Sequence, residues 1–272
     1  MKDLKLLDGA MGTELMKLGL RLGAFPEQVN LTDPAAVKSI HRAYLDAGSD
    51  ILYACTFGAN PMKARGADIA PVIAAALENA RTAAGDRARV ALDVGPLGQL
   101  LEPYGDLSEE KAHSAYRQVF EAGKTAELVV LETFFDLQEA LLALETAKTL
   151  LPKAECFVTM TFQASGRTLT GVTPAEAARE LTAAGADAVG LNCSLGPAEA
   201  LPMVRELREN TALPLIVKPN AGIPDPRTGA YPLSAAAFGE AMEPIAALGV
   251  SYIGGCCGTD PDYIRALGRL RA

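Results

Sequence analysis

The chain contains no tryptophan and only two histidines among its 272 residues. Tryptophan is the best residue for an aromatic cage around a quaternary ammonium group, so its absence disfavours such a cage. Seven tyrosines and eight phenylalanines do not exclude one. His41 and His113 fall inside helical patterns, away from the ends of the expected strands. We therefore expect neither histidine to be a metal ligand.

The sequence also lacks long apolar runs and clusters of basic residues. No stretch approaches the roughly 18 apolar residues that a membrane helix needs. The formal net charge is -8, and no group of Lys and Arg marks a surface for nucleic acid or anionic lipid. The first residues lead into a short apolar segment without the apolar core of a signal peptide. We expect a cytoplasmic protein that binds neither nucleic acid nor membrane.

Short runs of aliphatic and β-branched residues recur along the chain, and longer helical patterns separate them. This alternation is typical of parallel strands joined by crossover helices. Eight such units in 272 residues match the usual size of a (β/α)8 TIM barrel, about 250 residues. An open doubly wound sheet is the second choice. The expected strands are 4–8, 50–55, 89–93, 127–132, 156–161, 188–192, 215–220 and 250–255.

The helical patterns between these strands begin with recognisable signals. Asp33 stands before Pro34, as a cap before a proline in the first turn. Thr173 precedes Pro174, and Glu176 follows three residues after Thr173, as in a capping box. No linker or low-complexity segment interrupts the rhythm, so we expect residues 1–272 to form a single domain. The polar stretch 224–229 is too long for a tight turn and is a candidate loop over the mouth of the barrel.

Functional residues of such a barrel lie at the carboxyl ends of its strands. Three thiols and three carboxylates occur at these positions. The residues there are Asp8, Thr56, Asp93, Glu132, Thr161, Cys193, Asn220, Cys256 and Cys257.

Two adjacent cysteines, Cys256 and Cys257, follow the last expected strand between glycines. Neighbouring residues of a regular strand point to opposite faces, so both thiols can reach one ion only where the backbone turns, and the glycines allow that turn. Cys193 ends a strand only one strand away from them in the ring. Three thiolates leave the fourth position of tetrahedral zinc open, as in a catalytic site. Two buried apolar thiols, or a disulfide between the adjacent cysteines, are the alternatives.

A site rich in thiolates suits a soft incoming ligand, which means another sulfur. Zinc would bind a substrate thiol as the thiolate near neutral pH, below the usual thiol pKa of about 8.5. These residues therefore predict the alkylation of a thiol.

Six motifs, running in order along nearly the whole chain, resemble the homocysteine S-methyltransferase family. The resemblance is to the homocysteine-binding domain of cobalamin-dependent methionine synthase in particular. The motifs are LDGAMGTE (7–14), TFGAN (56–60), ETF (132–134), LNCSLGP (191–197), PNAG (219–222) and GGCCGT (254–259).

The resemblance implies that Cys193, Cys256 and Cys257 hold Zn2+ and that the homocysteine thiolate completes the tetrahedron. The product would be methionine. Methionine synthase joins this domain to folate-binding, cobalamin-binding and reactivation domains, and we expect none of these within residues 1–272. We expect the donor to be methylcobalamin carried by a separate corrinoid protein. S-methylmethionine or another small sulfonium is the alternative, betaine is disfavoured, and a non-catalytic barrel that binds zinc and homocysteine is a further alternative.

The same resemblance implies roles for several other residues at the mouth. Glu132 would contact the substrate ammonium, and Asp8 with the backbone amides of Gly9 and Ala10 would place the amino-acid end. Asn220 would be a resting ligand or a neighbour of the zinc.

Some residues keep more than one interpretation. Cys55 stands where the family pattern differs, and we expect a buried small residue rather than a group at the zinc site. Lys218 could be a Schiff-base nucleophile, but an ion pair with Asp or Glu at the mouth is favoured. Asp93 and Glu132 could form a general acid/base pair, which methyl transfer to a metal-bound thiolate does not need.

Overall fold

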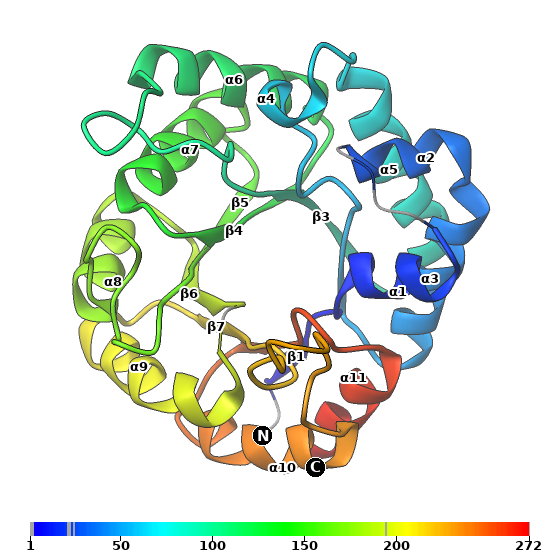
Figure 1. Cartoon of the computed structure of the whole chain (residues 1–272), viewed down its shortest axis with the longest axis vertical. Helices are drawn as coiled ribbons and strands as arrows, with labels where there is room; N and C mark the ends of the chain where they lie inside the picture. Colours follow the sequence, from blue (N-terminus) through cyan, green and yellow to red (C-terminus); the bar gives the residue numbers. More distant parts are fainter. Residues whose placement is uncertain (1–2, 21–22, 24, 194, 272) are drawn as a thin grey trace.

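The computed structural model describes residues 3–20, 23, 25–193 and 195–271. Eight parallel strands form a ring, and the helices surround it (Figure 1). Around the ring, each strand from β2 to β8 pairs with the next in sequence, and β8 pairs with β1. The strands are β1 (Lys5–Leu6), β2 (Ile51–Tyr53), β3 (Arg89–Val94), β4 (Leu128–Phe134), β5 (Glu155–Met160), β6 (Ala188–Asn192), β7 (Leu215–Lys218) and β8 (Tyr252–Ile253).

The seam between β1 and β2 is held by fewer contacts than the other strand pairs. A single parallel bridge joins Leu7 to Ile51. Asp50 adds two hydrogen bonds, since its backbone N–H donates to the Leu6 carbonyl and its carboxylate accepts from the Leu6 N–H. The sheet is thus a nearly closed TIM barrel, and the open doubly wound alternative is wrong.

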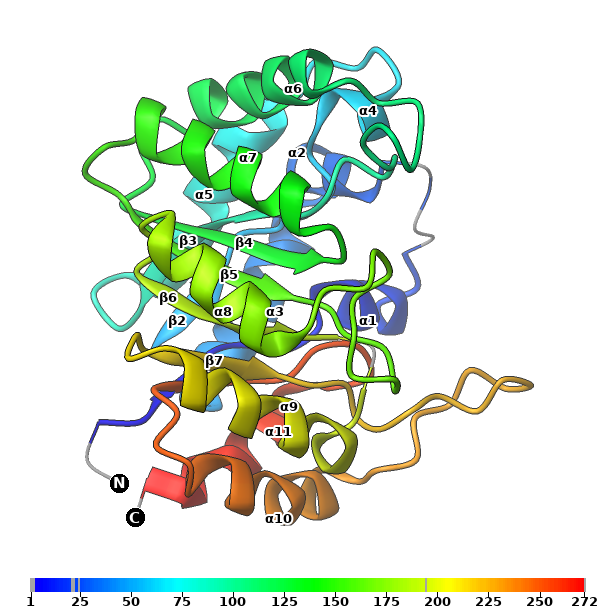
Figure 2. The same cartoon turned by 90° about the vertical axis from the view of Figure 1, so that its left-hand side faces the viewer.

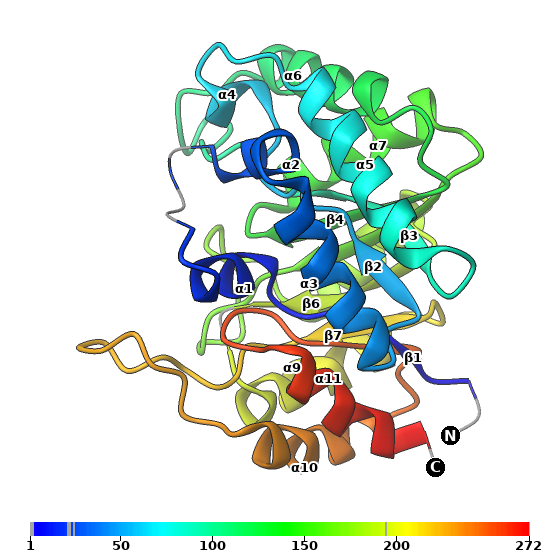
Figure 3. The ribbon, with the colours of Figure 1, turned by 90° about the vertical axis from the view of Figure 1, so that its right-hand side faces the viewer.

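Helices follow the strands and form the outer layer (Figures 2 and 3). Asp33 and Thr173 cap their helices through side-chain oxygens that accept from the N–H groups of Ala36 and Glu176, as predicted. Among the described residues no helix has the length and apolar character to cross a bilayer. The helices are α1 (Met11–Lys17), α2 (Val29–Thr32), α3 (Pro34–Asp46), α4 (Pro61–Ala64), α5 (Ala70–Ala84), α6 (Glu109–Ala122), α7 (Leu137–Leu150), α8 (Pro174–Ala183), α9 (Pro197–Asn210), α10 (Ala235–Ala246) and α11 (Pro261–Leu267), with 3-10 turns at Pro26–Gln28 and Gly268–Arg271.

Side chains alternate between the two faces of the strands, so the molecule has two apolar clusters. The larger cluster fills the space between strands and helices, and the smaller one fills the interior of the barrel. Within β4, for example, Leu128 and Val130 belong to the inner cluster, whereas Val129 and Leu131 belong to the outer one. This alternation determines which residues near the strand ends point toward the barrel axis.

Several strands are shorter than predicted. The expected segment 4–8 is regular only over Lys5–Leu6, 50–55 only over Ile51–Tyr53, and 250–255 only over Tyr252–Ile253. Beyond Ile253 the chain leaves the ladder but still bonds to its neighbours, since the N–H groups of Gly254 and Gly255 donate to Val217 and Asp8. The loops that follow these strands are buried, so their residues are also apolar. Composition therefore did not mark the strand ends, and the predicted strands were too long.

Candidate functional site

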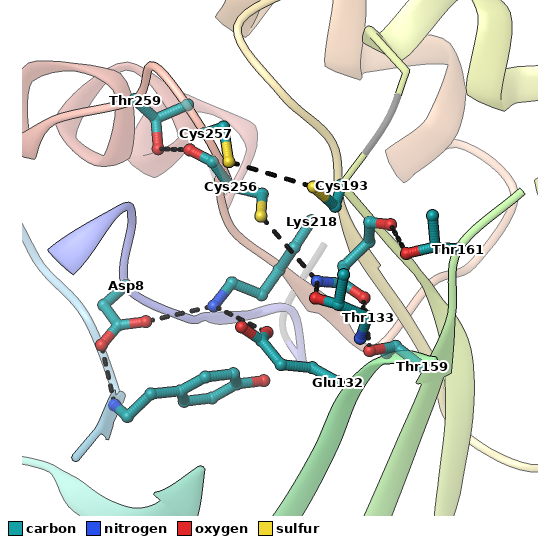
Figure 4. A network of polar contacts seen from close by, with 12 residues as sticks. Asp8, Glu132, Thr133, Thr159, Thr161, Cys193, Lys218, Cys256, Cys257 and Thr259 are labelled. Carbon is teal, nitrogen blue, oxygen red and sulfur yellow. Dashed lines mark hydrogen bonds and ion pairs between the residues drawn. The ribbon is translucent and has the colours of Figure 1, made fainter. Parts of the chain in front are cut away.

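Polar side chains form the top layer of the barrel interior, at the carboxyl ends of the strands (Figure 4). They continue the two-residue period of the inner apolar cluster. Glu132 lies two residues beyond Val130, and Lys218 lies two beyond Ile216. Asp93 stands in the same relation to Ala91. All three polar residues are buried, so their charges face one another rather than water.

The three predicted thiols meet at this end of the barrel. The sulfur atoms of Cys193, Cys256 and Cys257 all lie within 4.8 Å of one another. Cys193 Sγ and Cys257 Sγ are 3.9 Å apart. Zinc–sulfur bonds of about 2.3 Å in a tetrahedron place two sulfurs about 3.8 Å apart, so this spacing fits a zinc ion. The donor set and its geometry are therefore suitable for a soft metal.

The local backbone brings these sulfurs together. Cys193 has a positive φ of 62°, a left-handed conformation that is unfavourable for a residue with a side chain. Its N–H donates to the Lys218 carbonyl, and the Cys256 N–H donates to Pro219. All five cysteines are described and none forms a disulfide, so the alternative of a bonded pair at 256 and 257 is wrong.

Two asparagines support the thiols, and only one of them was singled out by the sequence. Asn220 Oδ1 accepts from the Cys257 N–H at 3.0 Å, which makes this residue a neighbour of the thiols. Asn192 donates from Nδ2 to Thr133 Oγ1 at 2.7 Å and contacts Cys256 Sγ at 3.8 Å. Asn192 is buried, and its place two residues beyond Gly190 on an inward-facing row was the signal that could have found it.

The thiols differ in acidity because they hydrogen bond to one another. Hydrogen bonds from Cys193 and Cys256 lower the pKa of the Cys257 thiol to about 3. Hydrogen bonds to Cys193 and Cys257, together with burial, raise the pKa of Cys256 well above its usual value. Of these two thiols, Cys257 is therefore the more acidic.

Lys218 occupies the space between the thiols and the carboxylates (Figure 4). Its Nζ lies 3.3 Å from Asp8 Oδ1 and 3.6 Å from Glu132 Oε2. The same ammonium stands 3.6 Å from the centre of the Tyr53 ring, within the range of a cation–π contact. The predicted ion pair at the mouth is confirmed.

The charge state of Lys218 follows from these neighbours. Burial alone would lower its pKa, but the charges of Glu132 and Asp8 outweigh burial and raise that pKa well above the usual range. A protonated amine is not a nucleophile, so this environment disfavours the Schiff-base alternative. Burial raises the pKa of Asp8 and of Glu132, and the Lys218 ammonium opposes both shifts.

Asp93 lies close enough to Glu132 for the two carboxyls to influence each other. Burial raises the pKa of Asp93 well above its usual value, and the charge of Glu132 raises it further. Asp93 Oδ1 and Glu132 Oε2 have no hydrogen-bond partner among the described residues. Asp8 is different, because its Oδ2 accepts from the Tyr53 N–H at 2.7 Å and its Oδ1 accepts from Lys218.

The remaining candidates lie at the edge of the site or outside it. Gly9 and Ala10 lie three and four residues beyond the end of β1, at the mouth. Their N–H groups donate to no acceptor in the described part of the chain. Cys55 is buried in the outer apolar cluster, as expected for a small packing residue. His41 is buried in α3 and His113 lies exposed on α6, so neither is near the thiols.

The loop between β7 and α10 covers the thiols with its base rather than with its tip. Residues 224–230 are mostly exposed and extend away from the barrel (Figures 2 and 3). Tyr231, nearer the end of this loop, hydrogen bonds to the Cys257 thiol. A Cβ on Gly258 would lie 2.2 Å from the Tyr231 ring, so the tyrosine packs directly on the turn that carries the cysteines. The prediction that residues 224–229 cover the mouth of the barrel is therefore wrong, and Tyr231 of the same loop packs over the thiols instead.

The comparisons with known proteins agree with this arrangement. A family model described as homocysteine S-methyltransferase matches residues 5–270. Methionine synthases from Mycobacterium leprae (strain TN) and Mycobacterium tuberculosis (strain ATCC 25618 / H37Rv) are each 33% identical over 285 residues. The match covers 95% of this chain but only 23% and 24% of theirs, so the chain spans about a quarter of these curated relatives. The metallated form of the homocysteine methyltransferase MmuM from Escherichia coli has a TM-score of 0.84 at 26% identity, over 98% of this chain and 96% of that one.

Proposed function

Because the chain belongs to the homocysteine S-methyltransferase family, we propose that it transfers a methyl group to the thiol of homocysteine and so forms methionine. The observation that carries this proposal is the convergence of Cys193, Cys256 and Cys257 within 4.8 Å at the open end of the barrel. We also propose that residues 1–272 act as a single domain, since the thiols come from β6 and from the segment after β8.

The metal we propose is zinc, held by the three cysteine sulfurs. The fit of the sulfur spacing and the metallated E. coli neighbour support this assignment. When bound, zinc would supply the positive charge that lets the acceptor thiol bind as a thiolate near neutral pH. Asn220 and Asn192 would hold the cysteines in place through their bonds to the Cys257 N–H and toward Cys256 Sγ.

The chain's other residues would bind and orient the acceptor. Glu132 Oε2 has no hydrogen-bond partner in the described chain and lies 3.6 Å from Lys218 Nζ. We assign this carboxylate to the acceptor ammonium, which would share it with Lys218. The N–H groups of Gly9 and Ala10 would bind the acceptor carboxylate. Asp8 would act indirectly, because both of its oxygens already accept from Tyr53 and Lys218. Tyr231, which packs on the turn that carries Cys257, would limit the access of water to the thiols and restrict the positions that the acceptor can take.

The methyl donor we propose is methylcobalamin carried by a separate corrinoid protein. The resemblance to a quarter-length segment of methionine synthases supports it. Apolar side chains exposed in α1, at its C-cap and in the loops after β3, β5 and β7 could contact such a carrier. These side chains are Met16, Leu18, Tyr104, Leu169 and Ile223. A small sulfonium such as S-methylmethionine is the second candidate, because the E. coli neighbour matches along nearly its whole length.

A donor screen tests the proposal. Zinc-loaded protein is incubated with homocysteine and, in turn, methylcobalamin, S-methylmethionine and betaine, and methionine is measured. We expect turnover with at least one of the first two, and loss of that turnover when a chelator removes the metal. Cys257→Ser should lose both metal and activity, whereas Cys55→Ala should keep both because Cys55 packs in the outer cluster.

Two results would contradict the proposal. Full activity of Cys257→Ser, or of chelator-treated protein, would exclude the thiol cluster as the reactive centre. Binding of zinc and homocysteine without methionine formation, even when a corrinoid protein is added, would favour a non-catalytic binding barrel.

A further inference from the structure

The ammonium group of Lys218 lies where the proposed function needs the ammonium group of the acceptor. Lys218 Nζ is 3.3 Å from Asp8 and 3.6 Å from Glu132, the two carboxylates at this side of the mouth that an acceptor's amine would approach. The side chain is almost fully buried, with 4% of its surface exposed. The chain thus presents to these carboxylates the same chemical group that homocysteine carries.

Lys218 is also held firmly in this position. The Tyr53 ring packs against its ammonium, 3.6 Å from the ring centre, and the Tyr53 N–H binds the same Asp8 carboxylate. Its backbone belongs to β7, between neighbours β6 and β8. Moving the ammonium away would leave Asp8 without its counter-ion in a buried place, which is costly.

A group attached to the protein competes with a free ligand at a high effective concentration. Lys218 therefore weakens the binding of a second ammonium at Asp8 and Glu132 without excluding it, since Glu132 Oε2 has no hydrogen-bond partner in the described chain. An acceptor that has a thiol and a carboxylate but no amine avoids this competition. It can still place its sulfur at the cysteines and its carboxylate at the N–H groups of Gly9 and Ala10.

We propose that Lys218 is a specificity-determining residue that partly neutralises the ammonium site with the chain's own ammonium, so that the pocket also accepts thiols lacking an α-amino group. This inference rests on the proposed function, since it concerns the acceptor of the same methyl transfer. The acceptor class is a short ω-mercapto carboxylate, of which 4-mercaptobutyrate is homocysteine without its amine.

Binding measurements on the zinc-loaded protein test this inference without any methyl donor. Calorimetric titration gives the Kd for homocysteine and for 4-mercaptobutyrate in the wild type and in Lys218→Met. We expect the two Kd values of the wild type to lie within about tenfold of each other. In Lys218→Met the preference for homocysteine should rise by at least about tenfold, because the freed carboxylates can bind its ammonium.

Matched variants make the outcome decisive. Lys63→Met removes another partly buried lysine near the mouth, one that stands over Phe57, and should leave the ratio unchanged. Lys218→Gln serves in place of the methionine variant if the latter does not fold, and should shift the ratio in the same direction. An unchanged or lowered homocysteine preference in the Lys218 variants would overturn the inference while leaving the proposed function intact. Failure of both thiols to bind would instead remove the proposed function.

Discussion

At the scale of single residues, the inward-facing rows of the strands explain which side chains reach the site. Val130 and Ile216 continue into Glu132 and Lys218, so apolar packing below determines the orientation of the charges above. The strand ends could be predicted from the sequence because parallel strands of a barrel all finish on one face. The partners of Asn192 could not, because Thr133 and Cys256 are 59 and 64 residues away.

Asn220 gives a prediction about the metal. Replacing it with Ala leaves the Cys257 N–H without its acceptor. The turn that carries Cys256 and Cys257 should then hold the two sulfur atoms less firmly in position. We expect zinc affinity to fall by about 10- to 100-fold, measured by competition with a chromogenic chelator. Asn220→Asp keeps an acceptor oxygen and should recover most of the affinity. Wild-type affinity in Asn220→Ala would show that this bond does not support the site.

His41 gives a prediction about pH. It is fully buried, neither ring nitrogen has a hydrogen-bond partner in the described chain, and burial lowers its pKa to about 4. In the unfolded chain the imidazole takes up a proton at about pH 6.5, whereas in the folded protein it stays neutral down to about pH 4. Protonation therefore favours the unfolded chain, and the unfolding free energy falls as the pH drops from about 6.5 toward 4. The loss attributable to His41 should reach about 2 to 3 kcal/mol at pH 4.5.

Urea unfolding at pH 7 and pH 4.5 measures this effect. Between these two pH values the unfolding free energy of His41→Leu should fall by about 2 to 3 kcal/mol less than that of the wild type. The exposed His113 provides the control. The unfolding free energy of His113→Leu should fall between pH 7 and pH 4.5 by the same amount as that of the wild type. Equal losses in the wild type and His41→Leu would mean that another group causes the acid sensitivity.

At the scale of elements, the packing of β6 against β7 leaves no room for a side chain at Gly190. A Cβ there would lie 1.8 Å from the Ile216 carbonyl oxygen, a backbone atom that cannot move aside alone. Gly190→Ala should therefore lower the unfolding free energy by about 3 kcal/mol, measured by chemical denaturation. Gly268→Ala is the control, because nothing lies within 4 Å of its added Cβ, and we expect a change below about 0.5 kcal/mol. A stability loss no larger than that of the control would contradict this packing argument.

The strands also show which parts of the fold could be predicted from the sequence. The order and number of strands followed from alternating apolar runs, whereas the true ends of β1, β2 and β8 did not. Buried loops are as apolar as strands, so composition does not separate them. The left-handed backbone at Cys193 is also invisible in the sequence, because glycine is the usual residue in that conformation.

At the scale of the whole molecule, the site depends on the complete ring. Cys193 and Cys257 are 64 residues apart in the sequence and 3.9 Å apart at their sulfur atoms. When no cation lies between its members, such a pair forms a disulfide if an oxidant from the surroundings takes up two electrons and the one remaining thiol proton is released. Oxidation of a chain without its ion would tie the end of β6 to the segment after β8 and remove two sulfurs from use. The reducing power of the surroundings, as much as the supply of metal, would then decide what fraction of the protein can bind its acceptor.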